Sequence, residues 1–465
     1  MLHWPALRAV TFAGAGERAR RRAAVAAHVT RCALPLILVA APVAAAAPPG
    51  ATTLPEVLRD VLRDNRDLDL RGWEAAATRA RATRAGSWES PSVEIGVENV
   101  PATGRFDEDP MTMKTIGLSQ RVPVFGANRL MRRAENEQLR ADTSSLSALR
   151  WERCGEAWET YAEAYFAGVR AAAAERHHDV MQRMVASARA RYESGRGRLD
   201  DLLRAQAEAA RVDADAAAWR ASEVESRAHL ATLRGIGAAA PAVPLAAPPA
   251  LAVGDDPRPW VGAALRHPRV REQEARVSRW RLAARAARRS AWPELELRAS
   301  YGLRQTLVNP IHGGSTEQDN MFSAMLGFTV PVFAGSRELA EAREMDAMAH
   351  AAEAERGGAE LALEQAVVTA HARAVAGART VRLISDTVLV LQRRSLDASW
   401  SAYSAGTSDL LGVFDAAHML YAEELREAEE RQAHAQAHAR LIALTGRFDL
   451  IGVSLPGTAR GKERP

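Results

Sequence analysis

Cysteines, aromatic residues and long apolar runs are scarce in this chain of 465 residues. Aromatic residues make up 5% of it, and its two cysteines are Cys32 and Cys154. Cys32 precedes a short apolar segment that we expect to be removed, so Cys154 would remain alone and no internal disulfide is possible. Beyond that segment, no uninterrupted apolar stretch of about 18 residues could form a transmembrane helix. The exported chain is therefore expected either to be soluble or to meet a membrane as a β-barrel.

The chain also lacks a large excess of either charge. Its formal net charge is +4, and basic and acidic residues are interspersed. No basic patch with interleaved aromatic residues is present, which argues against nucleic acid as a partner. No enzyme motif or cofactor motif stands out. His434 and His438 are four residues apart, but the segment HAQAH lacks the Glu of the metalloprotease pattern, so we expect solvated polar histidines. For Cys154 we expect a buried packing role.

The N-terminal residues 1–47 are typical of a secretory signal. A basic stretch, RARRR at 18–22, precedes the apolar run ALPLILVAAPVAAAA at 33–47. Together with the Ala-x-Ala ending, this pattern predicts cleavage near Ala47. At 15 residues, the apolar run is too short to span a membrane comfortably.

The rest of the chain contains the same sequence pattern in two successive copies. The tetrapeptide VPVF occurs at 122–125 and at 330–333, which are 208 positions apart. Tyr192 and Tyr403 begin a second pair of similar phrases, YESGRGRLDDLL and YSAGTSDLLGVF, 211 positions apart. Two phrases at nearly one period indicate an internal duplication. The predicted divisions are a first repeat at 48–237, a Pro/Ala linker with little order of its own at 238–256, a second repeat at 257–450 and a tail at 451–465.

Each repeat has the same expected order of elements: helix, strand, loop, strand, long helix, tight turn and returning helix. The first helices are expected at 54–90 and 257–291, before Pro91 and Pro293. Apolar and polar residues alternate in the expected strands, at about 92–100, 111–124, 294–304 and 321–332. Gly126 and Gly335 open the long helices, and the returning helices are expected at about 199–234 and 410–444.

The strands and helices together suggest a structure that reaches away from a membrane. The first long helix would extend about 100 Å at 1.5 Å per residue, more than a globular core requires. Strands of about 10 residues with one apolar face are typical of barrels between lipid and water. Four strands are too few to close a barrel, so identical chains would have to share it. Four aromatic residues are expected either to form a membrane-interface girdle or to plug the helix–strand junctions: Trp88, Phe125, Trp292 and Phe333.

The segments SQRVPVFGANR and TVPVFAGSRELAEA, with the two hairpin-tip phrases, resemble the TolC-like outer membrane efflux proteins over residues 54–450. The resemblance implies a mainly α fold with a membrane β-barrel part, built from tandem-duplicated long helical hairpins and four strands per chain. Three chains would form a twelve-stranded barrel and a periplasmic helical cylinder in the outer membrane of a Gram-negative bacterium. The implied function is a passive exit duct that needs no cofactor and is not an enzyme. The implied partners are a periplasmic adaptor protein and an inner-membrane pump of the resistance-nodulation-division type.

The same resemblance places the working residues at the hairpin tips. The residues expected to contact the adaptor are Gly195, Arg196, Leu199, Gly406, Thr407 and Leu410. Some family members narrow the periplasmic aperture with acids six and nine positions after the second tip glycine, which here are Gly412 and Asp415. The ion pair that ties the closed state in such members would fall on Ser408 and Asp201, and these cannot pair as ions. Asp409 either supplies the missing acid or caps a helix N-terminus.

The exported substrate is the least determined feature. PSVEIGVENVP and FDEDPMTMKTIGLSQRVPVFG resemble the branch found with heavy-metal efflux systems. Met111 and Met113 would face one side of a strand, where their thioethers suit soft ions such as Cu(I) or simply fill the strand face. Two other hypotheses stay open at this point: a soluble periplasmic coiled-coil scaffold and a periplasmic metal-binding protein.

Overall fold

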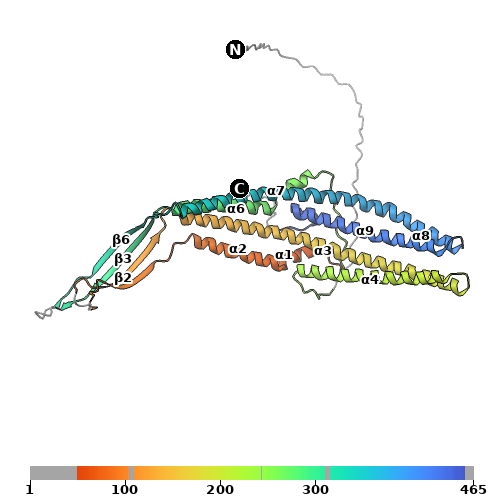
Figure 1. Cartoon of the computed structure of the whole chain (residues 1–465), viewed down its shortest axis with the longest axis horizontal. Coiled ribbons are helices and arrows are strands. Elements are labelled where there is room, and N and C mark those ends of the chain that lie inside the picture. Colours follow the sequence, from red (N-terminus) through yellow and green to blue (C-terminus); the bar gives the residue numbers. More distant parts are fainter. Residues whose placement is uncertain (1–49, 103, 105–108, 242, 309–314, 456–465) are drawn as a thin grey trace, which may run out of the picture. The chain divides into compact units, whose positions relative to one another are not determined.

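The computed structural model describes residues 50–102, 104, 109–241, 243–308 and 315–455. The predicted signal segment at 1–47 and residues 456–465 of the predicted tail lie outside them. Figure 1 presents the described part as long helices with strands at one end.

The first helical segment is two helices rather than the one expected over 54–90. Helix α1 (Leu54–Asp64) and helix α2 (Arg66–Ala85) meet at Asn65, whose backbone is extended. The Asn65 side chain accepts from the backbone N–H groups of Asp67 and Leu68 and donates to the Leu233 carbonyl at 2.9 Å. The helix breaks at Asn65, which caps α2 and also hydrogen-bonds to a residue 168 positions away. The local sequence pattern could not predict this distant contact.

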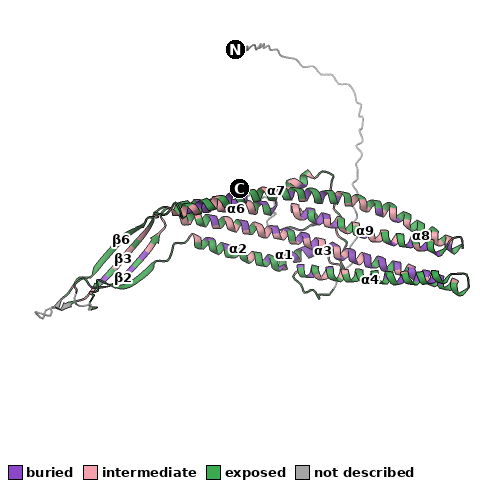
Figure 2. Ribbon diagram, viewed as in Figure 1, coloured by how far each residue is buried: buried purple, intermediate pink, exposed green. Residues whose placement is uncertain are grey.

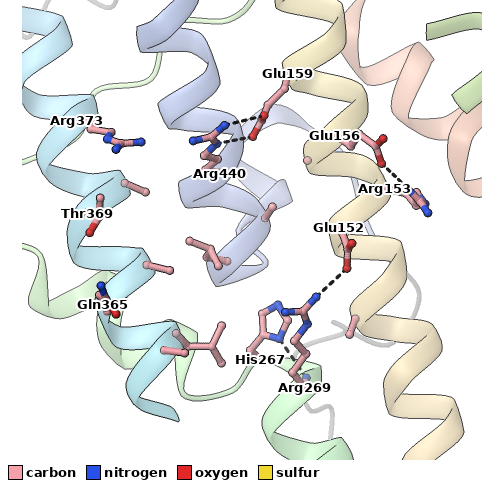
Figure 3. A pocket seen from close by; sticks show the side chains of 18 residues that line it. Glu152, Arg153, Glu156, Glu159, His267, Arg269, Gln365, Thr369, Arg373 and Arg440 are labelled. Atoms are coloured by element: carbon pink, nitrogen blue, oxygen red, sulfur yellow. Dashed lines mark hydrogen bonds and ion pairs between the residues drawn. The ribbon is translucent and has the colours of Figure 1, made fainter. Parts of the chain in front are cut away.

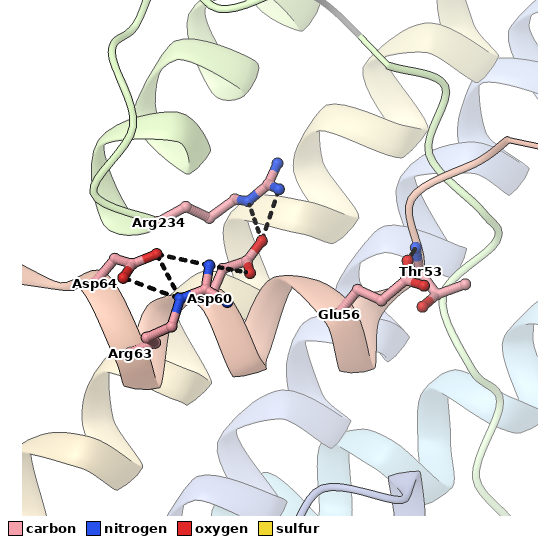
Figure 4. Close-up of polar contacts among 6 residues, drawn as sticks. All are labelled: Thr53, Glu56, Asp60, Arg63, Asp64 and Arg234. Carbon is pink, nitrogen blue, oxygen red and sulfur yellow. Dashed lines mark hydrogen bonds and ion pairs between the residues drawn. The ribbon is translucent and has the colours of Figure 1, made fainter.

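Helix α1 is fixed at both ends by polar contacts (Figure 4). Thr53 and Glu56 form a capping box, in which the Thr53 N–H donates to the Glu56 carboxylate at 2.8 Å. Asp60 pairs with Arg234 at 2.8 Å. Gly235 has a φ of +72°, and a Cβ there would lie 2.2 Å from the Asp64 carbonyl oxygen. Only glycine allows this close approach, which seats α1 on the end of the first hairpin.

Two helical hairpins carry the duplicated pattern. The first consists of α3 (Ala127–Glu193) and α4 (Leu199–Leu233), joined at Gly195 with a φ of +73°. The second consists of α7 (Glu338–Leu383), a π-helical turn (Ile384–Val388), α8 (Leu389–Ser404) and α9 (Leu410–Thr445), with Gly406 at its tip. The expected continuous helix from Gly335 therefore starts three residues later and is interrupted by the π turn. The expected helix over 257–291 is split into α5 (Arg258–Ala264) and α6 (Pro268–Ser290).

The helices lie side by side with α3 in the middle. Nearer the strands the order is α2, α3, α6 and α7, and nearer the tips it is α4, α3, α9 and then α7 and α8 (Figure 1). This arrangement leaves two edges of the helical layer without a helical neighbour among the described residues. One edge is formed by α2 and α4, and the other by α7 and α8.

The main core lies around the middle of α3, where α1, α5 and the end of α9 pack together. Trp158 and Tyr161 are fully buried there against residues such as Leu58 and Ile442. The linker, expected to have little order, contains no helix among its described residues, and it docks on this core. The Tyr161 hydroxyl lies 2.6 Å from the Ala246 carbonyl oxygen and 3.0 Å from the Thr52 carbonyl oxygen. Burial of the phenol therefore fixes the linker through its backbone.

Four of the described strands form one antiparallel sheet in the order β1-β2-β3-β6. Their bounds are β1 (Ser92–Glu98), β2 (Met113–Val122), β3 (Glu294–Arg304) and β6 (Met321–Thr329), and β4 (Leu307–Val308) pairs with β5 (Ser315–Thr316) beyond β3. β2 and β6 end earlier than expected, shortly before Pro123 and Pro331, because proline has no N–H for the ladder. Figure 2 shows that the strands are mostly exposed, whereas buried residues follow the helices.

Candidate functional site

The sheet carries one apolar face that no described element covers. The register brings Ile95, Ile116, Tyr301 and Phe322 into one row across all four strands. Neighbouring rows add Val93, Leu118, Leu297, Leu326 and Phe328, all of which are exposed large apolar side chains. Ile95 is 81% exposed and Phe322 is 71% exposed. A continuous patch of this kind marks a surface that meets an apolar partner.

The opposite face of the sheet is polar and more sheltered. Ser119 and Gly117 are buried on this face. Arg298 lies 3.4 Å from Glu94 and 3.5 Å from Glu296, and Arg121 lies 3.2 Å from Glu89. The sheet therefore shelters its polar side and exposes its apolar side, the reverse of a sheet in a water-soluble domain.

Aromatic residues lie where helices and strands meet. Trp88, Phe125, Trp292 and Phe333 are all exposed. Phe125 and Trp292 contact each other, with ring centroids 5.2 Å apart. Trp88 and Phe333 form no ring pair within the described residues, and both the girdle and the plug stay predictions.

The thioethers of Met111 and Met113 lie at the far end of the sheet. Met111 precedes β2, and its sulfur lies 3.7 Å from Arg304 Nη2, with the Met321 sulfur on the same nitrogen at 2.6 Å. Met113 packs against Gly302. A guanidinium thus occupies the position between the Met111 and Met321 sulfurs.

Both hairpin tips have the same backbone design. Gly195 and Gly406 adopt left-handed conformations, with φ of +73° and +78°, and the space around each is open. Leu199 is exposed at the start of α4, whereas Leu410 is buried beside Tyr403 and Val413. Arg196 and Thr407 continue the turns through backbone bonds to Arg191 and Ala402. The tips present their turn backbone, with Arg196 and Leu199 exposed at the first tip, and a small apolar cluster lies behind them.

The residues expected at the aperture have separate environments. Asp409 caps α9, because its carboxylate accepts from the Gly412 N–H at 3.2 Å. The Ser408 hydroxyl lies 3.5 Å from the Asp409 carbonyl oxygen. Asp415 is exposed and lines a groove of about 600 Å³ between α4 and α9. Asp201 is half-buried on the first turn of α4 and has no ion pair within the described residues.

A contact between the two hairpins, which the sequence did not indicate, lies just behind the tips. Arg191 donates to the Tyr403 carbonyl at 2.9 Å, and its guanidinium stacks 4.0 Å from the centre of the Tyr403 ring. Arg176 and Glu424 pair at 3.2 Å farther along. The only signal for the first contact was the tyrosine shared by both repeats, whose partner lies 212 residues away.

A second cleft, of about 730 Å³, opens between α3, α7 and α9 (Figure 3). Its acidic side chains are already paired. Glu159 pairs with Arg440 at 2.9 Å, Glu152 with Arg269 at 2.9 Å, and Glu156 with Arg153. Arg373 also lines the cleft and has no ion pair within the described residues, so the lining carries one more basic than acidic side chain.

The expectation of solvated histidines at 434 and 438 is wrong. His438 is fully buried, His434 is half-buried, and their ring centroids are 4.2 Å apart. Burial lowers the pKa of both, that of His438 to about 3, with the neighbouring His434 contributing. Their helix face packs against α7 instead of facing water, a tertiary fact that residue spacing cannot convey. Cys154 is buried as expected, and burial raises its thiol pKa to about 12.

In the part of the chain that the structure describes, no group of three or more His, Cys, Asp or Glu side chains is arranged to hold a metal ion. No helix there combines the length and apolarity needed to cross a membrane.

A sheet with an exposed apolar face, joined to two long helical hairpins, defines a mainly helical fold with one surface suited to an apolar partner. The chain belongs to the outer membrane efflux protein family, whose model matches residues 57–236 and 261–447. No curated protein sequence matches it.

Solved structures share the fold at low sequence identity. The outer-membrane channel OprN is 20% identical with a TM-score of 0.69, over 84% of this chain and 89% of OprN. CusC is 16% identical with a TM-score of 0.70, over 84% and 91%. The outer membrane protein VceC of Vibrio cholerae is 17% identical with a TM-score of 0.70, over 84% and 96%. The mainly helical fold with four antiparallel strands is therefore that of outer membrane channels.

Proposed function

We propose that the chain is the outer membrane exit duct of a tripartite efflux system, through which small solutes pass passively to the exterior. The exposed apolar face of the sheet is the observation that carries this proposal. Water disfavours such a face, whereas lipid accepts it, and the sheltered polar face would line an aqueous channel. Membership of an efflux family favours transport over enzymatic chemistry.

The sheet edges support assembly from several copies. β1 and β6 each have one edge without a strand partner in the described chain. Lipid cannot satisfy the backbone groups of an open edge. Because β6 is antiparallel to β1 through the intervening strands, β6 of one copy can continue the pattern with β1 of the next. Three copies would close a twelve-stranded barrel by rotation alone.

The helical edges have complementary side chains. The face of α4 that points away from α3 carries small residues at heptad-like spacing after Leu203: Ala207, Ala210, Ala214, Ala217 and Ala221. The free edge of α7 and α8 carries large ones, Leu361, Val368, Leu383 and Leu391, and Leu361 is 70% exposed. Large residues of one copy can therefore pack between small residues of the next, as in a coiled coil.

The tips are proposed to meet a periplasmic adaptor through Gly195, Arg196, Leu199, Gly406, Thr407 and Leu410. The aperture would be lined by Asp201, Ser408, Asp409 and Asp415, and the Arg191–Tyr403 contact would hold the hairpins together in place of the missing ion pair. Trp88, Phe125, Trp292 and Phe333 would lie at the membrane interface. The inner-membrane pump, the signal segment at 1–47 and the division into two repeats also stay predictions.

Heavy-metal cations are the proposed substrate class. This part of the proposal is supported only by the sequence resemblance of the first two strands. The structure adds no selective site in the sheet, since Arg304 lies between the two sulfurs. Deletion of the gene should then sensitise cells to copper, silver, zinc, cobalt or cadmium. If deletion sensitises cells only to organic drugs, these drugs are the substrate class, and the proposal of an exit duct still holds.

The assembly can be tested with the purified mature chain. We expect a trimer in detergent by light scattering and a stable conductance in planar bilayers. Leu383→Glu should weaken the trimer, whereas the control Arg382→Glu, at an exposed charged neighbour, should not. A chain that is monomeric and water-soluble without detergent would overturn the duct and favour the scaffold hypothesis.

A further inference from the structure

The cleft between α3, α7 and α9 has hydrogen-bond donors on its α7 side that lack acceptors. Gln365, Thr369 and Arg373 line the cleft at successive turns of α7 (Figure 3). Residues four apart lie on the same side of a helix. None of these three side chains forms a hydrogen bond or an ion pair within the described residues. The α7 wall therefore offers an amide, a hydroxyl and a guanidinium to an occupant of the cleft.

A buried histidine between α5 and α6 adds a further donor. His267 borders the cleft and is 5% exposed. Its Nδ1 accepts the backbone N–H of Arg269 at 3.1 Å, and Trp151 contacts the ring edge-on with centroids 4.9 Å apart. Burial lowers the pKa of His267 to about 4, with Arg269 and Arg271 contributing. Near pH 7 the ring is therefore neutral and carries its proton on Nε2, because Nδ1 is the acceptor.

The charges of the cleft favour an anionic ligand over a cationic one. Every carboxylate that lines the cleft already has an arginine partner, in the pairs Glu159–Arg440, Glu152–Arg269 and Glu156–Arg153. Arg373 is the lining arginine that remains without a carboxylate within the described residues. An anion therefore meets an unpaired guanidinium, with which it can form charge-assisted hydrogen bonds. A cation meets no unpaired carboxylate there.

The size and shape of the cleft indicate an organic ligand. Its volume of about 730 Å³ is within the range of sites that hold organic molecules and exceeds what a small inorganic anion fills. Apolar side chains line it between the donors, among them the buried Leu363 and the half-buried Leu444. Arg373 and Gln365 are separated by about 12 Å along the helix axis at 1.5 Å per residue. A ligand that uses both ends must be elongated and apolar in the middle.

We propose that this cleft binds an elongated organic carboxylate that carries a neutral hydrogen-bond acceptor, such as a hydroxyl, at its far end. The carboxylate would accept hydrogen bonds from Arg373 and Thr369. The apolar body would lie along Leu363, and the distant oxygen would accept from Gln365 and from His267 Nε2. Such a ligand connects α7 to the start of α6 and should stabilise their packing on α3. The proposal goes beyond the duct function and does not rest on it, because binding is measured on the purified chain.

The test is isothermal titration of the full mature chain in neutral detergent with 10-hydroxydecanoate, after subtraction of a titration into detergent alone. We expect saturable binding of one molecule per chain. Decanoate, which lacks the hydroxyl, should bind about 3–10-fold more weakly, and 1,10-decanediol, which lacks the charge, about 10–100-fold more weakly. Absence of saturable binding, or equal affinity for the diol, would overturn the proposal. A chain without this site can still conduct, so its failure would be distinct from failure of the duct.

Two variants assign the ligand to the cleft. Arg373→Gln should weaken binding of 10-hydroxydecanoate about 10–100-fold and leave that of the diol unchanged. The control Arg382→Gln, at an exposed arginine of α7 that does not line the cleft, should keep the affinity of the unchanged chain. Unchanged affinity in Arg373→Gln would place the ligand elsewhere and reject the site.

Glu159→Gln keeps the test decisive if Arg373→Gln folds poorly. This change removes the carboxylate partner of Arg440 and leaves a second guanidinium available at the cleft. Binding of 10-hydroxydecanoate should then become at least about threefold tighter. A gain of affinity cannot result from misfolding, and unchanged or weaker binding in this variant would contradict the proposed site.

Discussion

The sheet and the middle of the helical bundle bury opposite kinds of side chain. Around α3, Trp158 and Tyr161 are fully buried, and most charged residues lie outside, with Arg170 as a buried exception. In the sheet, Ser119 is buried, whereas Ile95 and Phe322 are exposed. The difference shows that a single chain can be built for two solvents. The helical core is covered by its own helices, whereas the apolar face of the sheet is covered by none of the described residues.

The largest expected effect lies in the helical core. Trp158→Ala should lower the free energy of unfolding by about 3–5 kcal/mol, because it leaves a cavity at a fully buried site. Trp88→Ala, at an exposed tryptophan beside the sheet, should change it by less than about 0.5 kcal/mol. Chemical denaturation followed by circular dichroism of the helices measures both. Equal losses would mean that the two regions do not differ as described.

As the pH falls, the helical bundle should lose stability through its buried histidines before its carboxylates take up protons. Burial lowers the pKa of His177 and His267 to about 4 and of His438 to about 3. The unfolded chain takes up these protons near pH 6.5, so stability is complete above that pH and is lost as pH falls toward the folded values. Each histidine contributes a slope of at most about 1.4 kcal/mol per pH unit.

This pH dependence can be measured by thermal unfolding between pH 7 and pH 5. The midpoint should fall over that range, and less steeply in His177→Gln than in the unchanged chain. His350→Gln, at an exposed histidine, should follow the unchanged chain. A flat midpoint would contradict the burial of neutral histidines.

In the sheet, two adjacent residues of β6 lie on opposite faces and allow each face to be tested separately. Leu326 is on the apolar face at 56% exposure, and Met325 is on the polar face at 57%. In lipid, Leu326→Asp should cost roughly 1–3 kcal/mol, because a charge then faces hydrocarbon. Met325→Asp lies across from Arg298 and should be tolerated. The yield of heat-stable oligomer extracted from outer membranes measures the difference. Equal yields would mean that the exposed face does not meet lipid.

The smallest expected effect concerns Asp409 at the second tip. Asp409→Ala should destabilise α9 by about 1 kcal/mol through loss of its cap, whereas Asp409→Asn should keep the cap. Thermal unfolding of both variants checks the capping role. If Asp409 also acts as an aperture acid, both variants should reduce the cation preference of the conductance, and unchanged selectivity in Asp409→Asn would leave only the cap.

Much of this architecture was predictable from local pattern. The alternation in ELELRASYGL predicted β3 at its observed bounds, Glu294–Arg304, because a strand has a period of two wherever it lies. Gly195 and Gly406 were recognised as turns because a tight reversal after a long helix favours a left-handed residue. The π turn at Ile384–Val388 had no such local sign.

The sequence by itself determined the duplication, the two-faced strands and the hairpins, since each depends on spacing between near neighbours. Only the tertiary structure decided the break at Asn65, the docking of the linker on Tyr161 and the burial of the His434–His438 pair. Each of these depends on a partner that is distant in the chain, such as Leu233 for Asn65 or Gly377 for His434. Spacing specifies which face of a helix a residue occupies, and packing alone decides whether that face meets water, lipid or another helix.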